Sequence, residues 1–181
     1  SLTSGSTGNP KPIILSEDTK IKRAQSLIEL YDIDKRDKIL IATPIYHTLA
    51  QRLIIISILL GLSCFFLRRF NSKNFIKIIK KKLITFSILV SSQIKQIAET
   101  SKNNKSIKIK SIISSSSILS KDVKNIFMKK FNCNFYECYG TSEISIATSI
   151  NFLKEKSKIG SVGKAINKVK IKILGKNNKF L

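Results

Sequence analysis

The sequence predicts an α/β fold in which a mostly parallel sheet is flanked by helices and carries an antiparallel strand at its C-terminal end. Short apolar runs alternate along the chain with segments of helical spacing, which is the repeated β-α pattern. Strands that are joined through helices run parallel and are covered on both faces. With 181 residues and 43% hydrophobic content, the chain can build the core of one domain of ordinary size.

Apolar runs predict the strands, and the segments between them predict the helices. The expected strands are KILIAT (38–43), SCFFL (63–67), LITFSILV (83–90), KIKSIIS (108–114) and NFYE (134–137), with helices over 46–60, 75–82, 92–99 and 121–131. Pro44 ends the first strand, and Phe75, Ile76 and Ile79 share one helical face opposite lysines. The alternation in KVKIKIL, beyond Gly163, favours an edge or antiparallel strand.

The longest apolar run, residues 53–67, raises the question of a membrane span. It holds about fifteen residues, short of the roughly twenty that a spanning helix needs, and Gly61 divides it. We therefore expect a buried helix followed by a buried strand, and no transmembrane segment.

The chain has 33 basic and 11 acidic residues, a formal net charge of +22, which is common in proteins that bind nucleic acid or an anionic membrane surface. Only five of the basic residues are arginines, the side chain best suited to reading base edges. The lysines are mixed with Ile and Asn, whose codons are also AT-rich, and stacking aromatic residues are not interleaved with them. We expect a lysine-rich solvated surface and no specific nucleic-acid partner.

Soft metal ligands are few: Cys64, Cys133, Cys138 and the single histidine, His47. Cys133 and Cys138 lie too far apart in sequence for the close pairing of a zinc knuckle. Reduced, buried thiols in a cytoplasmic protein are the expectation.

Three short motifs carry candidate chemistry. The first, LTSGSTGNPKP (residues 2–12), suits a phosphate because it combines glycines, hydroxyl groups and a lysine: Thr3, Ser4, Gly5, Ser6, Thr7, Gly8 and Lys11. Its spacing is not that of a P-loop NTPase, and a mobile polar tail is the alternative. The second is Pro44-Ile45-Tyr46-His47, in which a lone histidine opens a helix. The third is Tyr139-Gly140-Thr141-Ser142-Glu143, directly after the strand over 134–137.

Together these motifs resemble those of the adenylate-forming enzyme superfamily, which includes acyl- and aryl-CoA ligases, luciferases and peptide-synthetase adenylation domains. Residues 3–11 are similar to its signature T-[ST]-G-[ST]-T-G-x-P-K-G, with Pro12 in place of the last glycine. Pro44 to His47 resembles the P-x-x-H segment beside the acyl pocket of CoA ligases. The turn at 139–143 resembles Y-G-x-[TS]-E.

The resemblance implies a role for each matching residue. Tyr139 would lie against adenine, Ser142 would contact the α-phosphate and Glu143 would hold Mg²⁺. It also implies a catalytic set, Lys11, His47 and Glu143, and further ATP-binding residues: Thr3, Ser4, Gly5, Ser6, Thr7, Gly8, Gly140 and Thr141.

Two weaker matches extend the resemblance toward the C-terminus. Ser115, Ser116 and Ser117 occupy the place of the family's S-G-[GA]-[AS]-P-L segment, with serines for glycines and Ile118 for proline. Residues 160–163 match the G-S-V-G turn that precedes a strand. We expect residues 1–181 to be a partial AMP-binding domain, from the phosphate loop to this strand, without the C-terminal lysine domain and inactive or poorly soluble alone.

The implied activity is an acid–CoA ligase that uses ATP and Mg²⁺ to turn a small carboxylic acid into an acyl-adenylate and passes the acyl group to CoA. His47 favours CoA over a carrier protein as the acceptor, because peptide-synthetase domains usually have a Phe-Asp segment here. A carrier-protein-loading enzyme and a non-catalytic relic that binds nucleotide or polyanions are the alternatives. A serine hydrolase is the weakest, since no G-x-S-x-G elbow is present.

Overall fold

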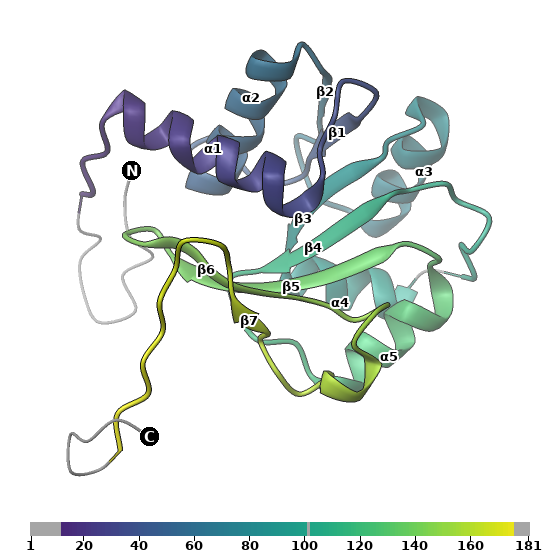
Figure 1. Cartoon of the computed structure of the whole chain (residues 1–181). Coiled ribbons are helices and arrows are strands. Elements are labelled where there is room, and N and C mark those ends of the chain that lie inside the picture. The colour runs from purple at the N-terminus through teal and green to yellow at the C-terminus, as the bar shows by residue number, and fades with distance from the viewer. Residues whose placement is uncertain (1–11, 101, 176–181) are drawn as a thin grey trace.

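The computed structural model describes residues 12–100 and 102–175, which form a seven-stranded sheet between two layers of helices (Figure 1). The helices are α1 (Glu17–Tyr31), α2 (Thr48–Leu60), α3 (Ser72–Lys82), α4 (Ser91–Thr100), α5 (Lys121–Lys130) and the short 3-10 helix η1 (Lys156–Lys158). The strands are β1 (Lys38–Ile41), β2 (Ser63–Phe66), β3 (Phe86–Val90), β4 (Ser111–Ser115), β5 (Asn134–Thr141), β6 (Ser145–Asn151) and β7 (Lys164–Ala165).

The strand order is β2-β1-β3-β4-β5-β6-β7. The pairs from β2 to β5 are parallel, and β6 and β7 add to this sheet in antiparallel pairs. The mostly parallel α/β fold with an antiparallel C-terminal end is therefore confirmed. After β1 the chain moves outward to β2 and then returns to the other side of β1 with β3, so the order reverses between β1 and β3. In open sheets of this kind, ligands bind at such a reversal, beyond the carboxyl ends of the strands.

Side chains alternate between two cores, one on each face of the sheet. Along β1, Ile39 and Ile41 pack with α1 and α2, whereas Leu40 faces α3, α4 and α5. Figure 1 shows the same division, with α1 and α2 on one side of the sheet and α3, α4 and α5 on the other. Burial on both faces explains why the central strands read as continuous apolar runs.

Local signals start and stop the helices. The Ser16 hydroxyl accepts a hydrogen bond from the Thr19 N–H at 3.2 Å and caps α1. The Asn71 side chain caps α3 by accepting from the N–H groups of Lys73 and Asn74. Gly61 ends α2 in the left-handed conformation, which costs a glycine little.

Besides the short η1, one helix and one strand were not anticipated from the sequence. Helix α1 buries only Ala24, Leu27 and Tyr31. This apolar stripe is narrow and lies among polar residues, so helical periodicity does not stand out in the sequence. Strand β6, with the sequence SIATSIN, is short in strongly apolar residues and turns back directly from β5.

Several expected strand bounds were wrong. The strand expected over 83–90 begins at Phe86, because Leu83 has a φ of 54° and caps α3. Strand β2 lies at the edge of the described sheet and is only half-buried, not buried. Beyond Gly163, regular pairing ends at Ala165 and the exposed KVKIKIL segment is mostly irregular, with Lys168 at a φ of 66°.

Within the described ranges, no helix is both long and apolar enough to cross a bilayer. Cys64, Cys133 and Cys138 are all free thiols. Cys133 and Cys138 are buried as expected, and Cys64 on the edge strand is partly exposed. Burial raises the pKa of the Cys133 thiol to about 12, so that thiol is protonated at neutral pH.

Candidate active site

The carboxyl ends of the parallel strands bring the later sequence motifs to one edge of the sheet. His47 follows β1, the serine segment 115–117 begins at the last residue of β4, and the turn at 142–143 follows β5. The thiol of Cys138 lies 3.5 Å from the carbonyl oxygen of Ser114, which ties β4 to β5 just before both motifs. The phosphate-loop residues, Thr3 to Gly8 and Lys11, lie outside the described residues.

The tyrosine motif is part of a hairpin. Strand β5 was expected to end at Glu137, but it continues through Thr141. Within this extension, Tyr139 pairs with Thr148 on β6. The pairing shifts register between Tyr139 and Gly140, as a β-bulge does. The Tyr139 side chain is 53% exposed, so its ring is accessible to a planar ligand.

Gly140 is required by close packing across this hairpin. A β-carbon placed on Gly140 would lie 2.0 Å from the carbonyl oxygen of Ser145, a distance that real β-carbons do not show. The role expected for Gly140 was contact with the nucleotide. The structure adds a second reason for glycine, which is the approach of the two strands.

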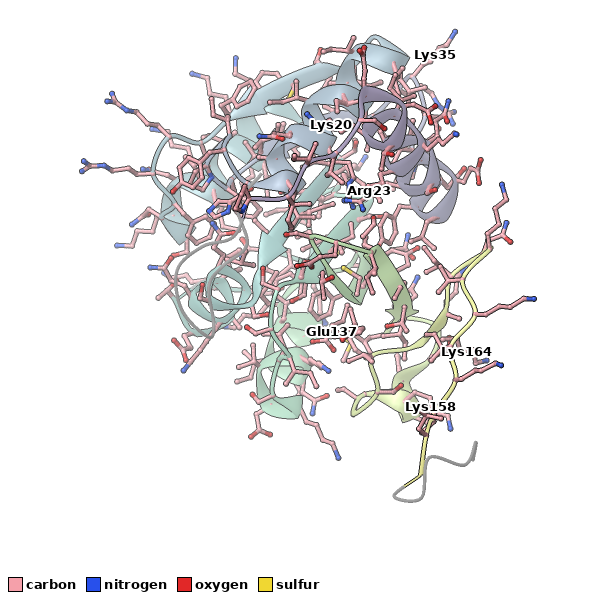
Figure 2. The ribbon with its side chains drawn as sticks, turned by 90° about the vertical axis from the view of Figure 1, so that its left-hand side faces the viewer. Lys20, Arg23, Lys35, Glu137, Lys158 and Lys164 are labelled. Atoms are coloured by element: carbon pink, nitrogen blue, oxygen red, sulfur yellow. The ribbon has the colours of Figure 1, made fainter. Side chains whose placement is uncertain are left out.

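An arginine on α1 holds the turn after β5. Arg23 donates from one nitrogen to the carbonyl oxygen of Ser142 at 2.8 Å and from another to that of Glu143 at 2.5 Å. Figure 2 shows Arg23 pointing from α1 toward this end of the sheet. Charge-assisted bonds to two successive carbonyl groups fix the backbone of the turn. The side chains of both residues are left for other contacts.

Glu143 presents an exposed carboxylate at this turn. A hydrogen bond from Thr141, a backbone hydrogen bond and the nearby charge of Arg23 lower the pKa of Glu143. The group is therefore ionised at neutral pH. Mg²⁺ is commonly held by one or two carboxylates together with phosphate oxygens and water, and one exposed, ionised carboxylate fits this requirement. No cluster of three or more His, Cys, Asp or Glu side chains that could hold a metal without phosphate occurs in the described part of the chain.

His47 is the N-cap residue of α2, but its side chain makes no capping hydrogen bond. The ring is exposed and packs against the Tyr46 ring, with 4.5 Å between their centroids. The imidazole is therefore not used to cap its helix. The imidazole is accessible at the edge of the sheet, close to the point where the strand order reverses between β1 and β3.

The serine segment after β4 takes a backbone shape that suits glycine. Ser116 has a φ of 86°, a conformation that L side chains rarely adopt. The hydroxyl of Ser91, at the start of α4, donates to the carbonyl oxygens of Ser115 and Ser117 and holds the segment. Ser116 and Ser117 are exposed.

A buried ion pair lies next to the serine segment. Lys124 on α5 and Glu137 on β5 are each 2% exposed, and the Lys124 Nζ lies 2.5 Å from the Glu137 Oε2. This contact is an ion pair without the alignment of a hydrogen bond. The other Glu137 oxygen accepts the Leu119 N–H at 2.9 Å, and Lys124 donates to the Ile159 carbonyl oxygen at 2.9 Å. Three segments are thereby held together next to the candidate site.

Sequence motifs missed the residues that position the site, namely Arg23, Lys124 and Glu137. Helical or strand periodicity carries no signal for them, because their contacts join segments that are distant in the sequence.

The α/β fold, with the tyrosine motif at the carboxyl edge of its sheet, is of the AMP-binding type. The chain belongs to the AMP-binding enzyme family, whose model matches residues 1–181.

The chain is similar to CoA ligases of known name. It is 30% identical over 173 residues to the long-chain-fatty-acid–CoA ligase of Bacillus subtilis (strain 168), a match covering 89% of this chain and 30% of the relative. It is 24% identical to the 2-succinylbenzoate–CoA ligase of Listeria monocytogenes serovar 1/2a, covering 94% of this chain and 37% of the relative. The chain thus spans 30 to 37% of the length of these curated relatives.

Solved structures share the fold. The O-succinylbenzoate CoA synthetase of Bacillus subtilis, in complex with ATP and a magnesium ion, matches with a TM-score of 0.87 and 21% identity over 99% of this chain and 38% of that chain. ATP-bound MatB from Rhodopseudomonas palustris matches with a TM-score of 0.84 and 24% identity over 99% of this chain and 36% of that chain.

Proposed function

We propose that the chain forms part of an acid–CoA ligase, in which Mg·ATP activates a small carboxylic acid as an acyl-adenylate and the acyl group passes to CoA. The observation that carries this proposal is the end of β5 and the turn after it, where an ionised, exposed Glu143 follows the exposed Tyr139 by four residues. Membership of the AMP-binding family and similarity to two CoA ligases support it.

The residues take roles by position. Tyr139, Gly140 and Thr141 border the adenine, Ser142 contacts the α-phosphate, and Glu143 holds Mg²⁺. Thr3, Ser4, Gly5, Ser6, Thr7, Gly8 and Lys11 bind the phosphates, and Ser115, Ser116 and Ser117 also contribute to nucleotide binding. Bound Mg²⁺ supplies positive charge to the transferring phosphates.

His47 has a separate role, beside the acyl group. Its accessible ring at the start of α2 supports this assignment. We assign residues 1–181 to an incomplete AMP-binding domain and place the protein in the cytoplasm.

Nucleotide binding by the 181-residue chain tests the proposal. ATP should bind in the presence of Mg²⁺, and Glu143→Gln should weaken that binding at least about tenfold, because it removes a charged metal ligand. Isothermal titration with ATP, with and without Mg²⁺, measures both effects.

Glu29→Gln is the matched control, since Glu29 is also an exposed glutamate but lies on α1 away from the turn. The control should bind Mg·ATP like the parent chain. Equal ATP affinity in the parent and in Glu143→Gln, or no effect of Mg²⁺ on the parent, would contradict the metal role of Glu143.

A further inference from the structure

Arg52 on α2 is a buried cation without a counter-charge. Its side chain is only 6% exposed. The described part of the chain gives its guanidinium no hydrogen bond and no ion pair. The charged or titratable groups that act on Arg52 are Arg23, Cys138 and Tyr31, and none of them is a carboxylate. Burial and the neighbouring Arg23 lower the pKa of Arg52 to about 10, so the group is still a cation at neutral pH.

A buried charge of this kind is costly unless an opposite charge joins it. Desolvation of an ion costs several kcal/mol, and hydrogen-bonded pairing is what offsets it. A guanidinium also has five N–H donors that require acceptors. Arg52 is therefore suited to receive an anion from outside the described chain.

Arg52 lines a small, half-open hollow between α1 and α2. Its volume is about 20 Å³, and its walls are Leu15, Lys20, Arg23, Thr48, Gln51, Arg52 and Ile55. Three of these seven residues are cationic and none is acidic. Thr48 is the first residue of the thirteen-residue helix α2, whose N-terminal end also favours an anion.

The hollow is small, and two of its walls are apolar. A volume of about 20 Å³ is enough for about one water-sized group, so an anion can place one oxygen atom in the hollow while the rest of it stays at the half-open mouth. A flat carboxylate matches the fork of a guanidinium and presents an apolar carbon chain toward Leu15 and Ile55. A tetrahedral phosphate carries charged oxygen atoms on every side and would press some of them against these apolar walls.

The hollow also borders the candidate active site. Arg23 lines it and holds the carbonyl oxygens of Ser142 and Glu143. Thr48 lines it and directly follows His47. Figure 2 shows Lys20 and Arg23 together on α1 near this end of the sheet. One molecule can therefore have one end at the turn after β5 and the other end in the hollow.

We propose that Arg52 binds the second acidic group of the substrate, so that the acid bound by this chain is a dicarboxylic acid. This inference rests on the proposed function for the acid at the active site. One carboxylate would lie near Glu143 for activation, and the distal carboxylate would pair with Arg52. Arg23 and Lys20 would add positive charge at the mouth of the hollow.

Matched acids test the proposal without ATP. The 181-residue chain is titrated calorimetrically, at constant ionic strength, with the pairs succinate and butyrate, glutarate and valerate, and adipate and hexanoate. We expect at least one diacid to bind at least about tenfold more tightly than its monoacid partner. Arg52→Gln should abolish this preference, and Arg52→Lys should restore only part of it because it lacks the fork. Arg69→Gln, which removes an exposed arginine, should leave the preference unchanged.

The possible results separate this proposal from the proposed function. Equal binding of every diacid and its monoacid, or no acid binding, would overturn the role of Arg52 even if Mg·ATP binds normally. Inorganic phosphate that competes for Arg52 as well as the best diacid would overturn it too, and would indicate a general anion site. A diacid preference that depends on Arg52, in a chain that does not bind ATP, would support the acid site and count against the ligase. Thermal unfolding of Arg52→Gln is the control for folding. The midpoint of this variant should not be lower than that of the parent chain, because the substitution removes a buried charge that has no partner.

Discussion

At the scale of single residues, the motif turn was found from the sequence, but the reasons for its shape were not. A short pattern such as Tyr-Gly-Thr-Ser-Glu identifies chemical groups by their order, and all five residues lie at the carboxyl edge of the sheet. The pattern cannot show that Gly140 lies against Ser145, because that contact depends on a strand, β6, that apolar periodicity did not reveal. For the same reason it could not show Arg23, which reaches the turn from α1.

Replacing Gly140 with alanine should destabilise the fold more than replacing Gly61. A β-carbon at Gly140 meets backbone atoms at 2.0 Å, so the hairpin has to shift, whereas nothing lies within 4 Å of a β-carbon at Gly61. Gly61→Ala carries only the strain of a φ of 67°, about 1–2 kcal/mol. For Gly140→Ala we expect the unfolding free energy, measured by urea unfolding, to fall by about 3 kcal/mol.

The two glycine variants control for each other, because each adds one methyl group to a glycine. A loss for Gly140→Ala equal to or smaller than that for Gly61→Ala would show that the hairpin relaxes freely around the added carbon.

At the scale of elements, periodicity was most reliable where burial is on both faces or in a wide stripe. Helix α3, with Phe75 and Ile79 buried, follows its predicted stripe. Helix α1 was missed because its buried stripe is narrow, and β7 is shorter than the alternation suggested because pairing stops at Ala165. Alternation predicts an element only where a neighbour is present to pair with it.

The buried pair of Lys124 and Glu137 joins α5 to β5 and should behave as a unit. Glu137→Gln keeps an acceptor for the Leu119 N–H but leaves the Lys124 charge uncompensated, so we expect a loss of about 3 kcal/mol in unfolding free energy. Adding Lys124→Met removes that charge. The double variant should therefore lose clearly less than the sum of the two single variants.

A double-mutant cycle measured by urea unfolding gives this coupling. The exposed pair of Lys22 and Asp18 serves as the comparison, and Asp18→Asn should change stability by less than about 0.5 kcal/mol. Additive effects of Lys124→Met and Glu137→Gln would mean that the buried pair contributes nothing specific.

At the scale of the whole molecule, the fold class followed from the sequence because the repeated β-α pattern spans most of the chain. The order of the strands did not, since periodicity says nothing about which strands are neighbours. The net charge of +22 is spread over the surface, with lysines such as Lys35, Lys158 and Lys164 at the periphery (Figure 2). Charge distributed in this way attracts polyanions without reading their sequence.

Binding to double-stranded DNA should therefore be weak and governed by salt. We expect fluorescence anisotropy to detect binding at about 50 mM salt and a steep loss of affinity by about 200 mM. The affinity falls because added salt reduces the free energy gained when counterions are released from the DNA. Two duplexes of unrelated sequence should bind equally. Affinity that persists at high salt, or that differs strongly between the duplexes, would indicate a nucleic-acid site that the charge alone does not explain.

The hydrogen bond from Arg23 to Ser142 also has a consequence for how the chain folds. It joins residues 119 positions apart, so it closes a loop that contains most of the sheet. Contacts of such long range form late, after the entropy of loop closure has been overcome by the intervening elements. During synthesis, Arg23 leaves the ribosome long before the turn that it holds. The shape of the turn after β5 is therefore completed only when β5 has been made and has joined the sheet.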